Sequence, residues 1–283
     1  FSDCGAGSRF DQEESAINEI LDLTLSADRG FVLDLKDRIH KLMLPEATGS
    51  CITRETVLTW MNVSDPRALF PCPPRLKAVE NPINRNAAFA IQTAMVNGDQ
   101  FICLHGEGGS GKTTVLKQVE YLLPEGSVMI TYDCYGAGTY MDSEAYRHRP
   151  KDAYLQLINE TSARLRLPLL INQDTSVDFI KAFSLRIESA SKVLEAQEAN
   201  ALLVVVIDAA DNSVTGAKQC KPEEISFVHE LIKIGNLPAN VRLMISARTG
   251  RLDSLSIPSK YNSVEISNFS LEETELNVLN QFP

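Results

Sequence analysis

The chain has 283 residues, of which 44% are hydrophobic and 23% charged, as in ordinary globular proteins. This composition excludes a wholly disordered or fibrous protein. Lys and Arg number 27 against 37 Asp and Glu, and the resulting net charge of −10 disfavours non-specific binding to nucleic acid. No apolar run reaches the ~18 residues that a transmembrane helix needs, so we expect no membrane partner.

The chain begins at Phe1, without an initiator Met or a signal peptide, and we expect it to be a piece of a longer protein. Its six cysteines are far apart and lack the spacing of zinc ligands. A chain of this length builds a core without disulfides, so we expect reduced thiols and a cytoplasmic location.

Residues 1–80 are expected to be a helical connector. Apolar residues recur at helical spacing within 17–25 and 32–39, and a short helix is predicted over 54–61. The segment 70–74, Phe-Pro-Cys-Pro-Pro, is too rich in proline for a helix and is predicted to be an extended linker. We place the domain boundary after it.

Residues 81–283 are expected to form an α/β domain with a mainly parallel five-stranded sheet flanked by helices, because strand-like and helix-like segments alternate. The run 202–207 has no polar side chain, which is typical of a central parallel strand. Strands are predicted at 101–105, 128–132, 202–207, 241–246 and 264–266, and helices at 87–96, 153–165 and 177–199, with one more helix after the first strand.

A glycine-rich motif, Gly-x-x-x-x-Gly-Lys-Thr, follows the first strand and precedes that helix. It is the phosphate-binding P-loop, in which backbone N–H groups and the positive end of a helix face the phosphates. Lys112 is expected to reach the β- and γ-phosphates, and Thr113 to bind Mg²⁺. The residues predicted to contact the nucleotide are Gly106, Glu107, Gly108, Gly109, Ser110, Gly111, Lys112, Thr113 and Thr114.

The rest of the site is predicted at the ends of two other strands. Asp208 follows the most apolar strand and is expected to hold Mg²⁺ together with Thr113. Asp211 is interpreted either as a catalytic residue that orients or deprotonates the attacking water or as a turn residue. Arg248 follows the fourth strand and is expected to stabilise charge on the γ-phosphate. Lys112 completes the predicted catalytic set.

Residues 146–151, Tyr-Arg-His-Arg-Pro-Lys, form a basic segment in an acidic chain. We interpret it as a solvated loop, and a contact with nucleotide, a neighbouring subunit or another ligand is the alternative. The guanine-recognition sequence Asn-Lys-x-Asp is absent, so ATP is the expected nucleotide.

The order of these motifs resembles that of the STAND class of P-loop NTPases, which includes NACHT and NB-ARC domains. The resemblance covers 81–283. The stretch 204–212 is similar to the family's hydrophobic run followed by Asp-x-x-Asp and an acidic residue, except that Asn212 replaces the last acid. The strand end 244–248 is similar to the family's sensor strand, and 264–273 to the stretch that leads into its helical and winged-helix parts.

Within this class, the P-loop region and 147–151 look most like bacterial antiviral (Avs-type) members. The resemblance implies an ATP-binding, slowly hydrolysing switch, with an effector such as a nuclease before Phe1 and a repeat sensor after Pro283. Recognition of a protein ligand from a phage would let ATP-bound subunits assemble into a tetramer or larger ring and activate the effector. Nucleic acid would contact only that effector.

Three other functions stay open. An AAA+-like remodelling ATPase usually has Asp-Glu at the end of this strand, where the present chain has Ala209 after Asp208. A small-molecule P-loop kinase would use 147–149 near its acceptor. A non-catalytic nucleotide-dependent scaffold is compatible with Asn212.

Overall fold

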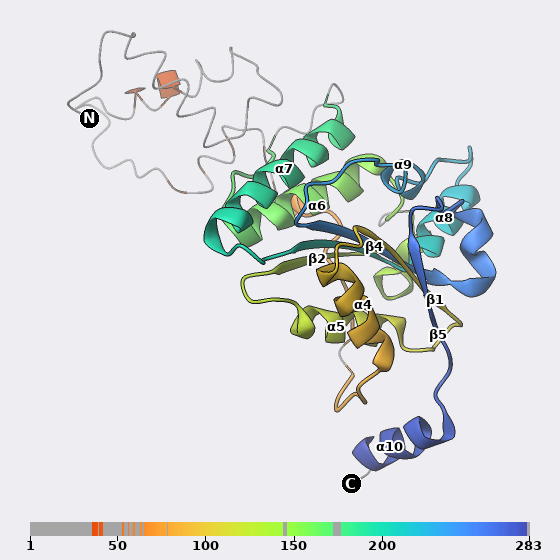
Figure 1. Ribbon diagram of the computed structural model, residues 1–283. Helices are drawn as coiled ribbons and strands as arrows, with labels where there is room; N and C mark the ends of the chain where they lie inside the picture. The colour runs from red at the N-terminus through yellow and green to blue at the C-terminus, as the bar shows by residue number, and fades with distance from the viewer. Residues whose placement is uncertain are drawn as a thin grey trace.

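A sheet of five parallel strands forms the centre of the fold (Figure 1). Its order is β2-β3-β4-β1-β5. The predicted fold class is confirmed, and each predicted strand lies within two residues of its expected bounds. The strands are β1 (Phe101–Gly106), β2 (Val128–Asp133), β3 (Leu203–Asp208), β4 (Val241–Arg248) and β5 (Asn262–Ile266).

The computed structural model describes residues 65–77, 79–143, 146–171 and 177–281, together with the scattered positions 36–38, 40–41, 53, 56, 59 and 63. The helices predicted over 17–25, 32–39 and 54–61 therefore lie outside the described residues, apart from those single positions.

Helices cover both faces of the sheet (Figure 1). Those on one face are α4 (Asn86–Val96) and α5 (Lys112–Leu122), and those on the other are α6 (Pro150–Leu165) and α7 (Phe179–Gln197). These confirm the four predicted helices. The remaining helical elements are η3 (Pro66–Leu69), η4 (Gly136–Met141), α8 (Ala210–Gln219), α9 (Val228–Leu231), η5 (Thr249–Ser254) and α10 (Leu271–Gln281).

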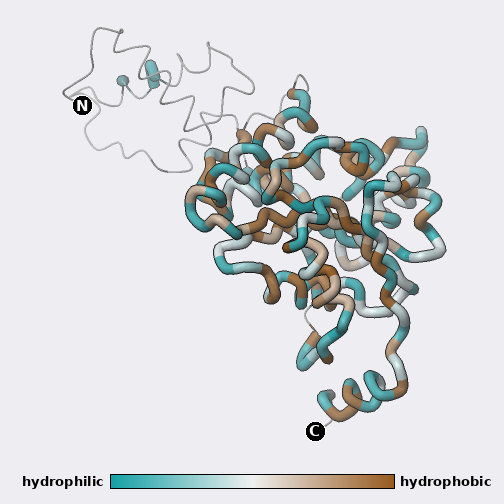
Figure 2. The backbone as a smooth tube through the Cα atoms, in the orientation of Figure 1, coloured by the Kyte–Doolittle hydropathy of each residue, from teal (hydrophilic) through white to brown (hydrophobic). Residues whose placement is uncertain are grey.

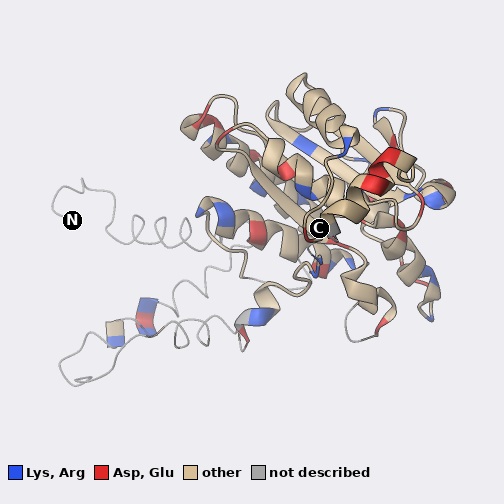
Figure 3. Cartoon of the chain, turned by 90° about the horizontal axis from the view of Figure 1, so that it is seen from below, with Lys and Arg blue, Asp and Glu red and all other residues tan. Residues whose placement is uncertain are grey.

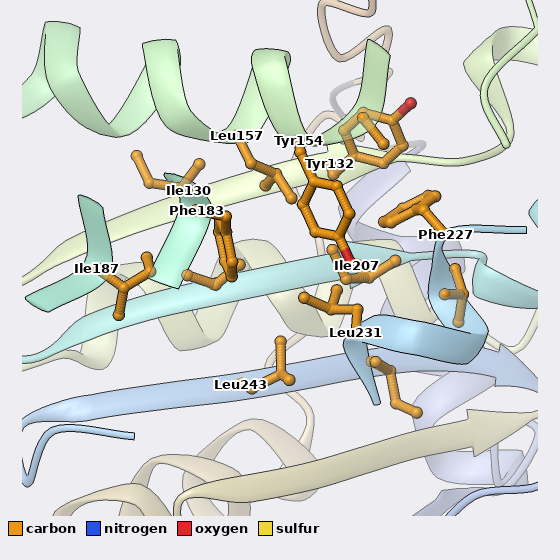
Figure 4. Packing of buried hydrophobic residues seen from close by; sticks show 14 of the residues in the cluster. Ile130, Tyr132, Tyr154, Leu157, Phe183, Ile187, Ile207, Phe227, Leu231 and Leu243 are labelled. Atoms are coloured by element: carbon orange, nitrogen blue, oxygen red, sulfur yellow. The ribbon is translucent and has the colours of Figure 1, made fainter. Parts of the chain in front are cut away.

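Two apolar clusters, one on each face of the sheet, form the core. On the α6–α7 face, Tyr132, Tyr154, Phe183 and Phe227 point toward one another (Figure 4). The rings of Tyr132 and Phe227 meet edge to face, with centroids 5.1 Å apart. The hydrophobic colour in Figure 2 is accordingly concentrated on the strands. Burying each large side chain stabilises the fold by about 1.5–3 kcal/mol, which holds the sheet rigid.

The position of the site follows from the direction of the strands. Every residue of β3 is buried, as expected for an apolar strand covered on both faces. Because all strands are parallel, the residues that follow β1, β2, β3 and β4 meet at one edge of the sheet. Ligands bind at this carboxyl edge in open α/β sheets.

The proline-rich segment predicted to be a linker packs against α6. Cys72 in this segment and Leu69 just before it are buried. The Cys72 N–H donates to Gln156 Oε1 at 3.0 Å, and Asn159 Nδ2 donates to the Leu69 carbonyl at 2.9 Å. The described residues before 81 thus contribute to the same core, and the domain boundary stays a prediction.

Among the described residues, no helix combines the length and apolarity needed to cross a membrane. Lys and Arg are interspersed with Asp and Glu over the described elements (Figure 3). The four cysteines that the structure describes are buried, unpaired thiols: Cys72, Cys103, Cys134 and Cys220.

Candidate nucleotide-binding site

The P-loop connects β1 to α5 at the carboxyl edge of the sheet. Gly111 is the N-cap of α5 and has a φ of 91°, a left-handed conformation that glycine adopts without strain. The Val115 N–H donates to the Gly111 carbonyl at 2.9 Å, which starts the helix. The first N–H groups of α5 therefore face the cleft with the positive end of the helix.

Lys112 is held over the loop that precedes it. Its Nζ donates to the carbonyl of Gly106 at 2.8 Å and to that of Glu107 at 2.7 Å. Burial lowers the pKa of Lys112, and the nearby Asp211 and Asp208 oppose that shift. The ammonium group thus lies at the loop where phosphate oxygens bind in P-loop proteins.

Thr113 and Asp208 lie side by side, as predicted from their separate motifs. The Thr113 hydroxyl donates to Asp208 Oδ2 at 2.9 Å. The Ser246 hydroxyl donates to the other carboxylate oxygen, and the Ala209 N–H donates to Ser246 Oγ at 2.8 Å. Burial raises the pKa of Asp208, while the bonds from Ser246 and Thr113 lower it. A hydroxyl and a carboxylate are hard oxygen donors, which fits Mg²⁺.

Asp211 joins α8 to the end of β4. Its carboxylate is only 1% exposed, and it accepts from the Arg248 N–H at 3.3 Å. Arg248 Nε lies 3.6 Å from Asp211 Oδ2, and Arg251 Nη1 donates to the same oxygen at 3.3 Å. Arg248 also donates to Asn212 Oδ1 at 3.3 Å. The predicted arginine is therefore at the cleft, and the Asp211 carboxylate is engaged by two guanidinium groups.

These groups line one cleft of about 420 Å³. Thr114 was predicted to contact the nucleotide but lines a neighbouring hollow beside α4. A larger cavity of about 570 Å³ lies around Leu202 and Asn240, at the opposite edge of the sheet from the P-loop. The predicted residues that line the cleft are Gly108, Gly109, Lys112, Thr113, Asp208, Asp211 and Arg248.

Sequence reasoning missed the wall of the cleft on the β2 side, which includes Arg75, Asp133 and Tyr135. Asp133 is 1% exposed and lies opposite Asp208 in the parallel pairing of β2 with β3. Its Oδ1 accepts from the Tyr135 N–H at 2.9 Å, and its Oδ2 from the Arg75 N–H at 3.0 Å. An Asp at the carboxyl end of a predicted strand was the available signal for this position.

The interpretation of 146–151 as a solvated loop is wrong for its centre. Arg147 is 2% exposed and donates to the carbonyls of Pro73 at 2.9 Å and Asp133 at 2.8 Å. His148 is also buried. The segment lies between β2 and α6 and passes under the proline-rich segment, so Arg147 binds carbonyls there instead of water.

Among the described residues, His148, Cys220 and Glu224 lie close enough together to be considered as ligands of one metal ion. His148 Nε2 lies 2.8 Å from Glu224 Oε2, and Arg149 donates to both oxygens of Glu224 at 3.0 Å. Arg149 and His148 lower the pKa of Glu224 to about 2. The carboxylate is already neutralised by a guanidinium, so this group is explained as an ion-pair cluster.

Comparison with known proteins supports the fold assignment. No protein-family model matches the chain, and no curated protein has a significantly similar sequence. The Walker-type ATPase PABY2304 of Pyrococcus abyssi is similar in structure, with a TM-score of 0.51 and 14% identity over 76% of this chain and 61% of that one. The ORC2 protein of Aeropyrum pernix gives a TM-score of 0.48 and 13% identity over 77% of this chain and 55% of that one.

This chain thus spans about three-fifths of the length of the Pyrococcus protein. At these identities the likeness concerns the fold alone. The chain has an α/β fold like that of the Walker-type ATPase, and its own P-loop lies at the carboxyl edge of the parallel sheet.

Proposed function

We propose that this chain is the nucleotide-binding part of a signalling switch that binds ATP with Mg²⁺ and hydrolyses it slowly. The observation that carries this proposal is the convergence of Lys112, the Thr113–Asp208 pair and Arg248 on one cleft. These groups supply a cation for the phosphates, oxygen ligands for the metal and a second cation for the γ-phosphate. When bound, Mg²⁺ would neutralise charge on the β- and γ-phosphates.

Slow hydrolysis is inferred from the carboxylates beside the metal pair. Asp211 is bound to Arg248 and Arg251, so two guanidinium groups compete with water for its carboxylate oxygens. The next residue is Asn212, whose amide cannot accept a proton from water. The catalytic role predicted for Asp211 is therefore proposed to be mainly the anchoring of Arg248.

The remaining parts of the proposal depend on the resemblance to STAND proteins of the Avs type. In them, recognition of a phage protein by a sensor leads ATP-bound subunits to assemble and to activate an effector. We propose the same sequence of events here, in antiviral defence, with this domain holding the assembled state while ATP is bound.

A remodelling ATPase of the AAA+ kind is the second candidate, and the likeness to a Walker-type ATPase is compatible with it. Such a motor needs an efficient general base, which the engaged Asp211 and neutral Asn212 disfavour. A small-molecule kinase is disfavoured because Arg147 and His148, the residues suggested for its acceptor region, are buried in the fold.

Binding is tested with the purified chain by calorimetry, using ATP, ADP and GTP with Mg²⁺. We expect Lys112→Ala to weaken ATP binding by about 100-fold, since it removes a charge-assisted contact with two phosphates. The matched control is Lys181→Ala, an exposed lysine on α7 that does not line the cleft. ATP binding that is unchanged in Lys112→Ala would falsify the P-loop assignment.

Hydrolysis is tested by phosphate release under multiple turnover. We expect slow release from the wild type and an increase of about tenfold or more in Asn212→Asp, which places an acidic group where the resembling family has one. Rapid turnover by the wild-type monomer contradicts the switch and favours the remodelling ATPase.

A further inference from the structure

Residues 69–77 form a strap that crosses the β2 side of the fold and ends at the cleft. Leu69 and Cys72 anchor its first part in the core beside α6. Arg147 binds its middle through the carbonyl of Pro73, and Lys117 Nζ donates to the carbonyl of Lys77 at 3.2 Å. The strap is therefore fixed on both sides of Arg75.

The backbone of Arg75 is attached to the strand end beside the metal pair. Its N–H donates to Asp133 Oδ2 at 3.0 Å, and Asp133 pairs in register with Asp208. Neighbouring strands are about 4.8 Å apart, so the backbone of Arg75 lies about one strand spacing from Asp208, on the β2 side. Both carboxylate oxygens of Asp133 accept hydrogen bonds from backbone N–H groups. These bonds account for the burial of the carboxylate without a metal ion.

The guanidinium group of Arg75 takes no part in holding the strap. The residue is exposed and lines the cleft, and no hydrogen bond or ion pair of its side chain occurs among the residues that the structure describes. Arg67, on the same segment, differs in that its side chain is paired with Asp65 at 2.9 Å. Arg75 is thus a cation at the cleft whose charge the fold does not use.

We propose that Arg75 binds the terminal phosphate of the nucleotide from the side of the cleft opposite the P-loop. This inference rests on the nucleotide binding proposed above. Lys112 lies at the P-loop and Arg248 at the end of β4, so Arg75 adds a cation on the β2 side of the cleft. A guanidinium group matches two phosphate oxygens at once, and Arg75 lines the same cleft as Lys112 and the Thr113–Asp208 pair.

The experiment compares affinities for ATP and ADP, both with Mg²⁺, by calorimetry on the purified chain. We expect Arg75→Gln to weaken ATP binding by about tenfold and ADP binding much less, because the lost contact is with the γ-phosphate. Arg75→Lys keeps the charge and should recover part of the ATP affinity. Arg67→Gln is the matched control and should bind both nucleotides as the wild type does.

The measured quantity is the ratio of ATP affinity to ADP affinity, which a general loss of folded protein does not change. A lower ratio in Arg75→Gln supports the proposal, and an unchanged ratio overturns it. The melting temperature without nucleotide should stay at the wild-type value, since the fold uses only the backbone N–H of Arg75. A wild type that binds neither nucleotide overturns the proposed function as well, whereas an unchanged ratio in a binding-competent Arg75→Gln overturns this inference alone.

Discussion

At the scale of single residues, the Asp208 carboxylate accepts bonds from Thr113 and Ser246 while it is 3% exposed. Burial raises its pKa above the ordinary value of 3.8. The folded chain therefore binds this proton more tightly than the unfolded chain does. The contribution of Asp208 to the free energy of unfolding falls as the pH rises through the interval between the two pKa values. Mg²⁺ needs the ionised form, so its affinity falls as the pH decreases through the same interval.

We expect Asp208→Asn to stabilise the chain in the absence of Mg²⁺ and nucleotide, because an amide can keep hydrogen bonds and carries no buried charge. The gain should be about 1 kcal/mol, or about 2–4 °C in melting temperature for a chain of this size. The variant should also lose Mg²⁺-dependent hydrolysis. Asp253→Asn, an exposed aspartate on η5, is the control. A lower melting temperature in Asp208→Asn contradicts the expectation.

At the scale of elements, the P-loop is seated against β5 through the last residue of β1. A Cβ on Gly106 would lie 2.5 Å from the carbonyl oxygen of Ile266 and 2.7 Å from Ser110 Oγ. Both distances are far below contact, and the backbone carbonyl cannot move without disturbing the pairing of β1 with β5. Glycine is thus required here for close approach of two chain segments.

We expect Gly106→Ala to lower the free energy of unfolding by about 1–3 kcal/mol and to weaken ATP binding, because the loop must shift to remove the overlap. Gly235→Ala is the matched control, since Gly235 does not line the cleft and a Cβ there meets no atom within 4 Å. Chemical denaturation and calorimetry measure the two effects. Equal free energies of unfolding for the two variants would contradict this expectation, because they would show that β5 can move away from the added Cβ without loss of stability.

At the scale of the whole molecule, the net charge of −10 opposes contact between copies, and charges of both signs are dispersed over the described elements (Figure 3). The helix α10 leads away from the sheet (Figure 1). Its side chains Leu271, Leu276 and Leu279 are exposed. An assembled state must therefore overcome like-charge repulsion, which salt screens within a Debye length of about 8 Å at physiological ionic strength.

We expect a slowly hydrolysed ATP analogue with Mg²⁺ to raise the mass of the protein in solution, and more so at 0.3 M than at roughly 0.05 M salt. Light scattering coupled to size exclusion measures this mass. Lys112→Ala should remain at the mass seen without nucleotide. A wild-type mass that does not depend on the analogue contradicts the predicted tetramer or larger ring.

Much of the fold and part of the site could be predicted because their signals are local. The apolar run of β3 and the strand–loop–helix around Lys112 and Thr113 are each contiguous in the chain. The helix α8 was not predicted, because Val214 is the one large apolar residue in Ala210–Gln219 and the buried polar residues of this helix are recognisable only once packed. The burial of Arg147 was missed for a related reason, because its partners are carbonyls of distant segments.

The sequence by itself determined that a parallel α/β sheet carries a P-loop, because side-chain periodicity and glycine-rich turns act over a few residues. Only the tertiary structure decided what completes the cleft. Strand order placed Asp133 next to Asp208, and a hydrogen bond across 58 residues of chain brought Arg75 to the same edge. Such contacts depend on which segments the packed core brings together, and no local pattern encodes that choice.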